Sequence, residues 1–111
     1  GLGIMGTPMA LHLVNKGHAL TVYTRSQVPE AITAAGGVRV DSAAAVAREA
    51  EVIFTMVPDT PDVEAVLFGK GGVAEGIGKG KVVVDMSSIS PMATKAFAKR
   101  INALGADYID A

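Results

Sequence analysis

The sequence contains no cysteine and no tryptophan, and aromatic residues make up only 5% of its 111 residues. The lack of cysteine excludes disulfides, thiolate nucleophiles and zinc–thiolate sites, and it favours a reducing, cytoplasmic compartment. Ten basic and eleven acidic side chains give a net charge of −1, and the lysines and arginines form no cluster along the chain. The charge pattern therefore carries no signature of a protein that binds nucleic acid or an anionic membrane.

Long apolar runs are also missing. Strand-like apolar runs such as residues 52–54 and 82–84 are far shorter than the roughly 18 residues of a membrane span. Half of the residues are nevertheless apolar, and the mean hydropathy is +0.38. These values are typical of a globular chain with a packed core, and the length suffices for one domain.

Periodic apolar segments alternate along the chain, and most of the 13 glycines lie between them. Ser42, Thr60 and Ser90 are the expected N-caps of three helices, and prolines follow the last two at the first helical position. The continuous hydrophobicity of residues 52–57 predicts a strand buried on both faces of a parallel sheet. The predicted helices are 5–16, 29–35, 43–49, 61–68 and 91–104, and the predicted strands are 20–23, 38–40, 52–57, 82–86 and 107–109. This alternation predicts an α/β fold of the Rossmann type, with a doubly wound and mainly parallel sheet.

A glycine motif precedes the first predicted helix. Gly1, Gly3 and Gly6, with Leu2, Ile4 and Met5 between them, match the pattern G-x-G-x-x-G. In a dinucleotide site the first glycine makes a tight turn, the second admits a pyrophosphate, and the third lets the helix pack closely on a strand. A glycine loop that opens a helix without any ligand has the same pattern, so this alternative stays open.

The motif stands at the very start of the chain, which predicts that residues 1–111 are a partial NAD(P)-binding domain, without its first strand and without a C-terminal helical domain. In the strand order 3-2-1-4-5-6, the first strand lies between the second and the fourth. Its absence would leave two facing sheet edges unpaired and apolar surface exposed, so we expect the isolated chain to aggregate or fold poorly.

Arg25 follows the predicted strand 20–23, which would be the second strand of a complete domain. The dinucleotide fingerprint places a coenzyme-selecting residue there, about 20 residues beyond the glycines. No carboxylate that could bind a ribose hydroxyl occurs before Glu30. Arg25 therefore favours NADP over NAD as the cofactor. A solvated arginine, or one that stacks on an adenine ring, would fit the same position.

Ser87 and Ser88 follow another predicted strand, where ligands bind in open α/β sheets. Their hydroxyls could contact ribose, carboxamide or substrate oxygens, or could form a turn that caps the next helix. His12 and His18 have no carboxylate at a supporting spacing, so structural roles are favoured for both. The residues alone therefore predict a cofactor site, with no catalytic acid and no metal site.

Four motifs extend this picture over the whole chain: G-L-G-I-M-G-T-P-M-A at residues 1–10, M-V-P-D-T-P-D-V at 56–63, D-M-S-S-I-S-P at 85–91 and D-Y-I-D-A at 107–111. With them the sequence resembles the β-hydroxyacid dehydrogenase family, which includes 6-phosphogluconate dehydrogenase. The last three motifs are closest to the branch that reduces tartronate semialdehyde.

The resemblance implies roles for individual positions. Residues 1–6 would hold the pyrophosphate, Val57 and Pro58 would line the ribose and nicotinamide side, and Ser88 would touch the cofactor near the substrate. Arg25 would select the coenzyme. Family members transfer hydride between a nicotinamide and a small hydroxyacid or semialdehyde, use a lysine from a later segment, and form homo-oligomers.

The reaction implied by the resemblance is reduction of tartronate semialdehyde to glycerate, with 3-hydroxyisobutyrate as the alternative substrate. A catalytically silent dinucleotide-binding module remains a third reading.

Overall fold

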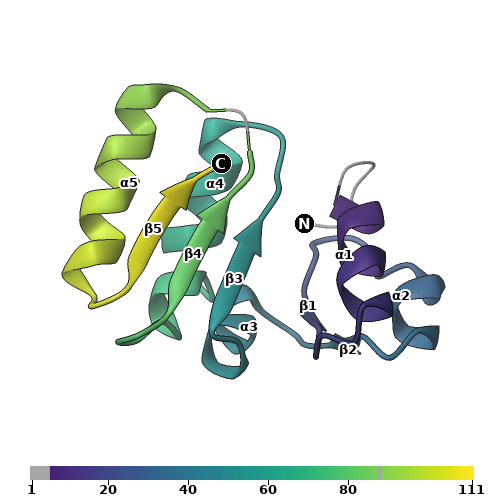
Figure 1. Ribbon diagram of the computed structural model, residues 1–111. Coiled ribbons are helices and arrows are strands. Elements are labelled where there is room, and N and C mark those ends of the chain that lie inside the picture. The colour runs from purple at the N-terminus through teal and green to yellow at the C-terminus, as the bar shows by residue number, and fades with distance from the viewer. Residues whose placement is uncertain (1–5, 88) are drawn as a thin grey trace.

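The computed structural model describes residues 6–87 and 89–111. Within this part of the chain, helices and strands alternate as the sequence predicts (Figure 1). The helices are α1 (Gly6–Asn15), α2 (Glu30–Ala34), α3 (Ala43–Glu49), α4 (Thr60–Phe68) and α5 (Pro91–Ala103), with a short 3₁₀ turn, η1 (Val73–Glu75). The strands are β1 (Thr21–Val22), β2 (Val38–Arg39), β3 (Val52–Thr55), β4 (Val82–Asp85) and β5 (Asp107–Asp110).

All strand pairs are parallel. β1 pairs with β2, and β3, β4 and β5 form a second sheet in that order. This arrangement confirms the doubly wound order 3-2-1-4-5-6, because β2 and β1 occupy its positions 3 and 2, and β3 to β5 occupy positions 4 to 6. Within the described residues no strand lies at position 1, between β1 and β3.

The helix starts follow the expected caps, with one correction. The Ser42 hydroxyl accepts a hydrogen bond from the Ala45 N–H at 3.0 Å, and Ser90 caps α5 in the same way. Thr60 is the first residue of α4, and the N-cap is Asp59. The prediction failed because proline is also tolerated at the second helical position, where its missing N–H would have had no partner inside the helix.

The larger core lies between the three-stranded sheet and the helices α3, α4 and α5. Its centre consists of side chains without solvent exposure, among them Val63, Leu67, Val83 and Ile101. The rings of Phe68 and Phe97 meet at 5.6 Å between centroids, and the Arg100 guanidinium lies 3.7 Å from the centroid of the Phe68 ring. These contacts join α4 to α5 over the sheet.

The expectation that residues 52–57 are buried on both faces is wrong. Ile53 and Thr55 are buried, whereas Val52 is 48% and Phe54 is 43% exposed. Burial alternates because α3 packs against one face of β3, while the side chains of the other face border a groove.

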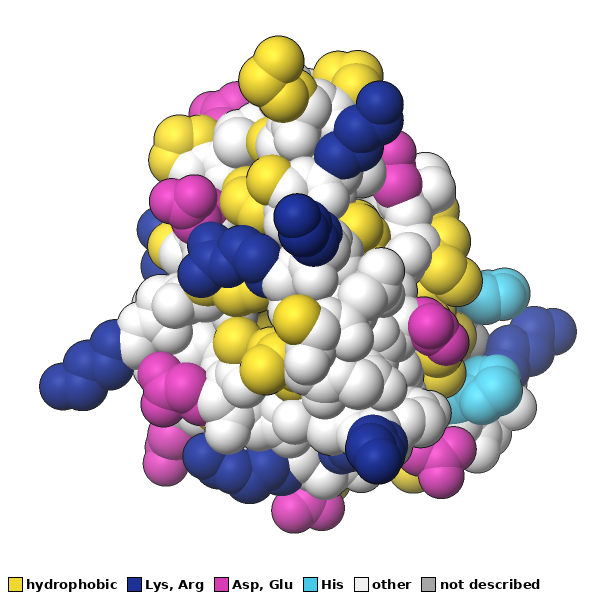
Figure 2. All heavy atoms as spheres, turned by 90° about the vertical axis from the view of Figure 1, so that its left-hand side faces the viewer, with side chains coloured by type: hydrophobic (Ala, Val, Ile, Leu, Met, Phe, Trp, Pro, Cys, Tyr) yellow, Lys and Arg dark blue, Asp and Glu magenta, His cyan; other side chains and the backbone are white. Residues whose placement is uncertain are grey.

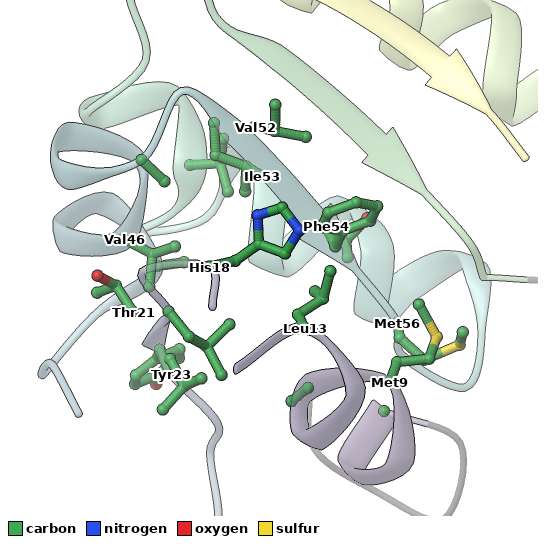
Figure 3. A pocket seen from close by; sticks show the side chains of 18 of the residues that line it. Met9, Leu13, His18, Thr21, Tyr23, Val46, Val52, Ile53, Phe54 and Met56 are labelled. Atoms are coloured by element: carbon green, nitrogen blue, oxygen red, sulfur yellow. The ribbon is translucent and has the colours of Figure 1, made fainter. Parts of the chain in front are cut away.

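This groove, called the inter-sheet groove below, separates β1 from β3. It encloses about 360 Å³, and its lining is mostly apolar, with Met9 and Leu13 of α1 and Val46, Val52 and Phe54 from the other side (Figure 3). The groove runs along the strand edges that lack partners in the described residues. It therefore coincides with the first-strand position of the fold and differs from the ligand-binding ends of the strands.

The surface outside α5 is mixed in character. Figure 2 shows positive, negative and apolar side chains interspersed over this side of the molecule. Met92 on α5 is the most exposed of the large apolar side chains, at 83%. Among the residues that the structure describes, no helix is long and apolar enough to cross a membrane.

We expect Val52→Lys to reduce self-association of the 111-residue chain, because it places a charge in the inter-sheet groove beside an unpaired strand edge. Sedimentation velocity over a range of protein concentrations measures this effect. Met92→Lys is the matched control, since it adds the same charge to an exposed apolar position outside the groove. If both substitutions reduced self-association equally, the chains would not associate through the inter-sheet groove.

Candidate functional site at the carboxyl ends of the strands

Parallel pairing brings the carboxyl ends of β3, β4 and β5 to one edge of their sheet. The register aligns Thr55 with Asp85 and Asp85 with Asp110. Figure 1 shows that the N-terminus of α1 points to the same upper edge of the molecule. A helix N-terminus presents free N–H groups and a partial positive charge, so this edge can attract an anionic ligand.

A buried carboxyl group organises the strand ends. Asp85 has no solvent exposure, and its two oxygens accept three hydrogen bonds. The Thr55 hydroxyl donates at 2.8 Å and the Ser87 N–H at 3.0 Å, both to Oδ1, and the Tyr108 hydroxyl donates at 2.9 Å to Oδ2. Asp85 therefore ties the end of β3 and the second residue of β5 to its own strand, and these four residues are called the Asp85 network below.

The environment of Tyr108 changes its acidity. Burial raises the pKa of the Tyr108 phenol well above its ordinary value, and the hydrogen bond to Asp85 and the negative charges of Asp85 and Asp110 act in the same direction. The phenol thus remains a donor to Asp85 over the whole physiological pH range.

Ser87 extends the network to the loop after β3. Its hydroxyl accepts a hydrogen bond from the Val57 N–H at 2.9 Å, and the residue is buried. The Ser87 hydroxyl thus makes a structural contact with the loop after β3, and it is Ser90 that caps the next helix, α5. Val57, which the resemblance places beside the cofactor, is half-buried, and the neighbouring Pro58 is exposed.

Arg25 lies three residues after β1 and lines a second cavity of about 240 Å³, called the Arg25 pocket below. The walls come from the end of β1, the start of α3, the α4 helix and the glycine-rich loop after α4. Arg25 Nη2 forms an ion pair with Asp62 Oδ1 at 3.2 Å. A second cationic side chain, Lys70, lines the same pocket.

Sequence reasoning did not identify Asp62 or Lys70 as part of this site. Asp62 lies in the first turn of α4, and Lys70 lies in the glycine-rich loop after that helix. The ion pair joins residues 37 positions apart, and no local pattern indicates such a contact.

The remaining predicted positions divide into two groups. Gly6 is buried at the first position of α1. Residues 1–5, with Gly1, Leu2, Gly3, Ile4 and Met5, and also Ser88, lie outside the described residues. The structure thus brings Val57 to the Asp85 network and places Arg25 in a separate pocket at the end of β1.

Lys81, the residue before β4, contacts the end of α3. Its ammonium donates to the backbone carbonyls of Ala47 and Arg48, the latter at 2.9 Å. These carbonyls belong to the last turn of α3, so Lys81 compensates the negative end of that helix.

A parallel sheet in doubly wound order, with a glycine motif ahead of its first helix, defines a dinucleotide-binding fold. Comparison with known families agrees with this class. Residues 1–111 match the model described as the NAD binding domain of 6-phosphogluconate dehydrogenase, and the chain belongs to this family.

Individual relatives are longer proteins. The chain is 53% identical, over all of its 111 residues, to 2-hydroxy-3-oxopropionate reductase of Escherichia coli (strain K12) and spans 38% of its length. The crystal structure of 3-hydroxyisobutyrate dehydrogenase from Mycobacterium tuberculosis with L-serine gives a TM-score of 0.89 at 27% identity, covering 100% of this chain and 38% of that one. Psf3 in complex with NADP+ and 2-OPP gives 0.87 at 27% identity, covering 97% and 39%.

We expect Asp85→Ala to destabilise the protein by at least about 3 kcal/mol, because three donors would lose their acceptor in a buried site. Thermal unfolding followed by circular dichroism measures the loss. Asp107→Ala removes an exposed aspartate from β5 and serves as the control, with an expected change below about 0.5 kcal/mol. Similar unfolding midpoints for the two variants would contradict the role of the network.

A second test concerns Tyr108. In a Tyr23→Phe background, where Tyr108 is the only tyrosine, ultraviolet absorbance should report tyrosinate formation only well above pH 10. The folded protein holds this proton more tightly than the unfolded chain, so the free energy of unfolding should fall as the pH rises above about 10. Titration of Tyr108 at its ordinary pKa would contradict the observed environment.

Proposed function

We propose that this chain binds the coenzyme of an NADP(H)-dependent reductase that converts tartronate semialdehyde (2-hydroxy-3-oxopropanoate) to glycerate. The coenzyme assignment rests on the position of Arg25 at the end of β1, beside a pocket that a second cation also lines. The substrate assignment rests on the 53% identity to 2-hydroxy-3-oxopropionate reductase over the entire chain.

Three parts of a dinucleotide have proposed partners in this chain. The N-terminus of α1, where Gly6 is buried, suits the pyrophosphate that residues 1–6 are proposed to hold. The loop with Val57 and Pro58, fixed by Ser87, would border the ribose and nicotinamide, and Ser88 would contact the coenzyme near the substrate. Arg25 would bind the 2′-phosphate of NADP, since a guanidinium forms strong, charge-assisted bonds to phosphate.

When bound, the nicotinamide supplies the hydride that the reaction needs. The residues of this chain bind and orient the coenzyme, and none of them is proposed as the catalytic acid. The Asp85 network contributes by holding the ends of β3, β4 and β5 in register, so that the loop after β3 keeps one position.

A second candidate substrate is 3-hydroxyisobutyrate. The structural similarity to the dehydrogenase from Mycobacterium tuberculosis, with a TM-score of 0.89, favours it. Turnover of tartronate semialdehyde and of 3-hydroxyisobutyrate by the purified full-length protein separates the two. Coenzyme binding without turnover of either would favour a catalytically silent module.

Arg25→Ala should weaken NADPH binding by about 10- to 100-fold, because a charge-assisted bond to phosphate contributes about 1.5–3 kcal/mol. NADH lacks the 2′-phosphate, so its affinity should change by less than about threefold. Fluorescence titration of the full-length protein with each coenzyme measures both affinities. Arg39→Ala, an exposed arginine on β2 outside the Arg25 pocket, is the matched control. An unchanged ratio of the two affinities in Arg25→Ala would refute the assigned role.

A further inference from the structure

The Arg25 pocket contains a charge that opposes phosphate binding. Asp62 lines the pocket together with Arg25 and Lys70, and its carboxylate already occupies the guanidinium at 3.2 Å. From this contact we infer that Asp62 is a second coenzyme-specificity residue, which lowers the preference for NADP(H) by competing with the 2′-phosphate for Arg25. The inference rests on the proposed function and concerns the same site.

The position of Asp62 is fixed by its own helix. It is the third residue of α4, and its second oxygen, Oδ2, accepts a hydrogen bond from the Asp59 N–H at 3.2 Å. The Asp62 side chain is only 25% exposed. The carboxylate therefore remains at the pocket whether or not Arg25 contacts it.

Arg25 is the movable partner. Its side chain is 70% exposed, and within the described residues its side-chain partner is Asp62. An exposed pair of this kind is weak, so a phosphate that approaches the guanidinium can displace the carboxylate. Phosphate carries more charge than a carboxylate and offers three acceptor oxygens, which favours the exchange.

Lys70 adds to the attraction for a phosphate. It lies in the loop after α4, whose backbone is held by hydrogen bonds from the Ala44 N–H to the Gly71 carbonyl and from the Gly72 N–H to the Gly69 carbonyl, each at 2.9 Å. With Arg25 and Lys70 against Asp62, the pocket carries one net positive charge. Removal of the Asp62 charge would raise it to two.

The ion pair between Arg25 and Asp62 also allows the site to bind NAD(H). Without a 2′-phosphate nothing competes for the guanidinium, so Arg25 stays paired with Asp62 and its charge remains compensated. The chain is then expected to accept both coenzymes, with a preference for NADP(H) that is smaller than Arg25 alone would give.

Asp62→Asn tests this inference in the full-length protein. The amide oxygen of asparagine still accepts the bond from the Asp59 N–H, while the negative charge is lost. We expect NADPH to bind about two- to fivefold more tightly, which corresponds to an exposed ion pair, and NADH affinity to stay unchanged. Fluorescence titration with each coenzyme gives the ratio, and a thermal unfolding midpoint confirms that the variant is folded.

Two further variants test whether the change in coenzyme selectivity requires the carboxylate beside Arg25 or follows from the loss of any negative charge on α4. Glu64→Gln removes an exposed carboxylate from the same helix, outside the pocket, and should leave the ratio of affinities unchanged. In an Arg25→Ala background, Asp62→Asn should raise the affinity for NADPH by less than it does in the wild-type protein. The reason is that no guanidinium is left for the carboxylate and the phosphate to compete for.

The outcomes distinguish this inference from the function on which it rests. A wild-type protein that binds both coenzymes, with an Asp62→Asn variant of unchanged selectivity, would overturn the role of Asp62 and leave the proposed function intact. A gain of the same size in Glu64→Gln would also overturn it. A wild-type protein that binds neither NADPH nor NADH would overturn both.

Discussion

The proposed site depends on the hydrogen bonds to the buried carboxyl group of Asp85. It lies without solvent exposure at the end of β4, and donors from β3, β5 and the following turn satisfy it. A buried acidic group is costly unless hydrogen bonds compensate it, so the three strands are constrained to one relative position. Ser87 passes this constraint to the loop after β3 through the Val57 N–H. The packing of the sheet and the shape of its ligand-binding edge are thereby coupled.

The ion pair between Arg25 and Asp62, at the other end of the proposed site, differs from the Asp85 network in exposure and in strength. The Asp85 carboxyl group is buried and hydrogen-bonded, whereas Arg25 is exposed and, among the described residues, is paired with Asp62. A rigid network suits the part of a site that must keep a loop in place. A weak, exchangeable ion pair suits the part that must accept a charged group or release it. The fold provides both because parallel strands end at a common edge, and the helices that follow them start there.

Much of the fold could be predicted from local signals in the sequence. Ser42 and Ser90 are caps because their hydroxyls accept N–H groups three residues on, which depends only on neighbouring residues. The cap at Asp59 was missed because proline is tolerated at either of two helical positions. The one-sided burial of β3 was missed because a run of apolar residues does not tell how much of each face is covered. Contacts across the sequence, such as Arg25 with Asp62 or Tyr108 with Asp85, leave no periodic pattern, and only the structure brings them together.

In the proposed binding mode, the coenzyme lies across the carboxyl ends of the strands with its adenosine end at Arg25. A crystal structure of the full-length protein with NADPH would locate each part of the coenzyme. We expect the pyrophosphate at the N-terminus of α1 and the 2′-phosphate within hydrogen-bonding distance of Arg25, with the ion pair to Asp62 broken. A coenzyme bound elsewhere, or a 2′-phosphate directed away from an Arg25 still paired with Asp62, would contradict it.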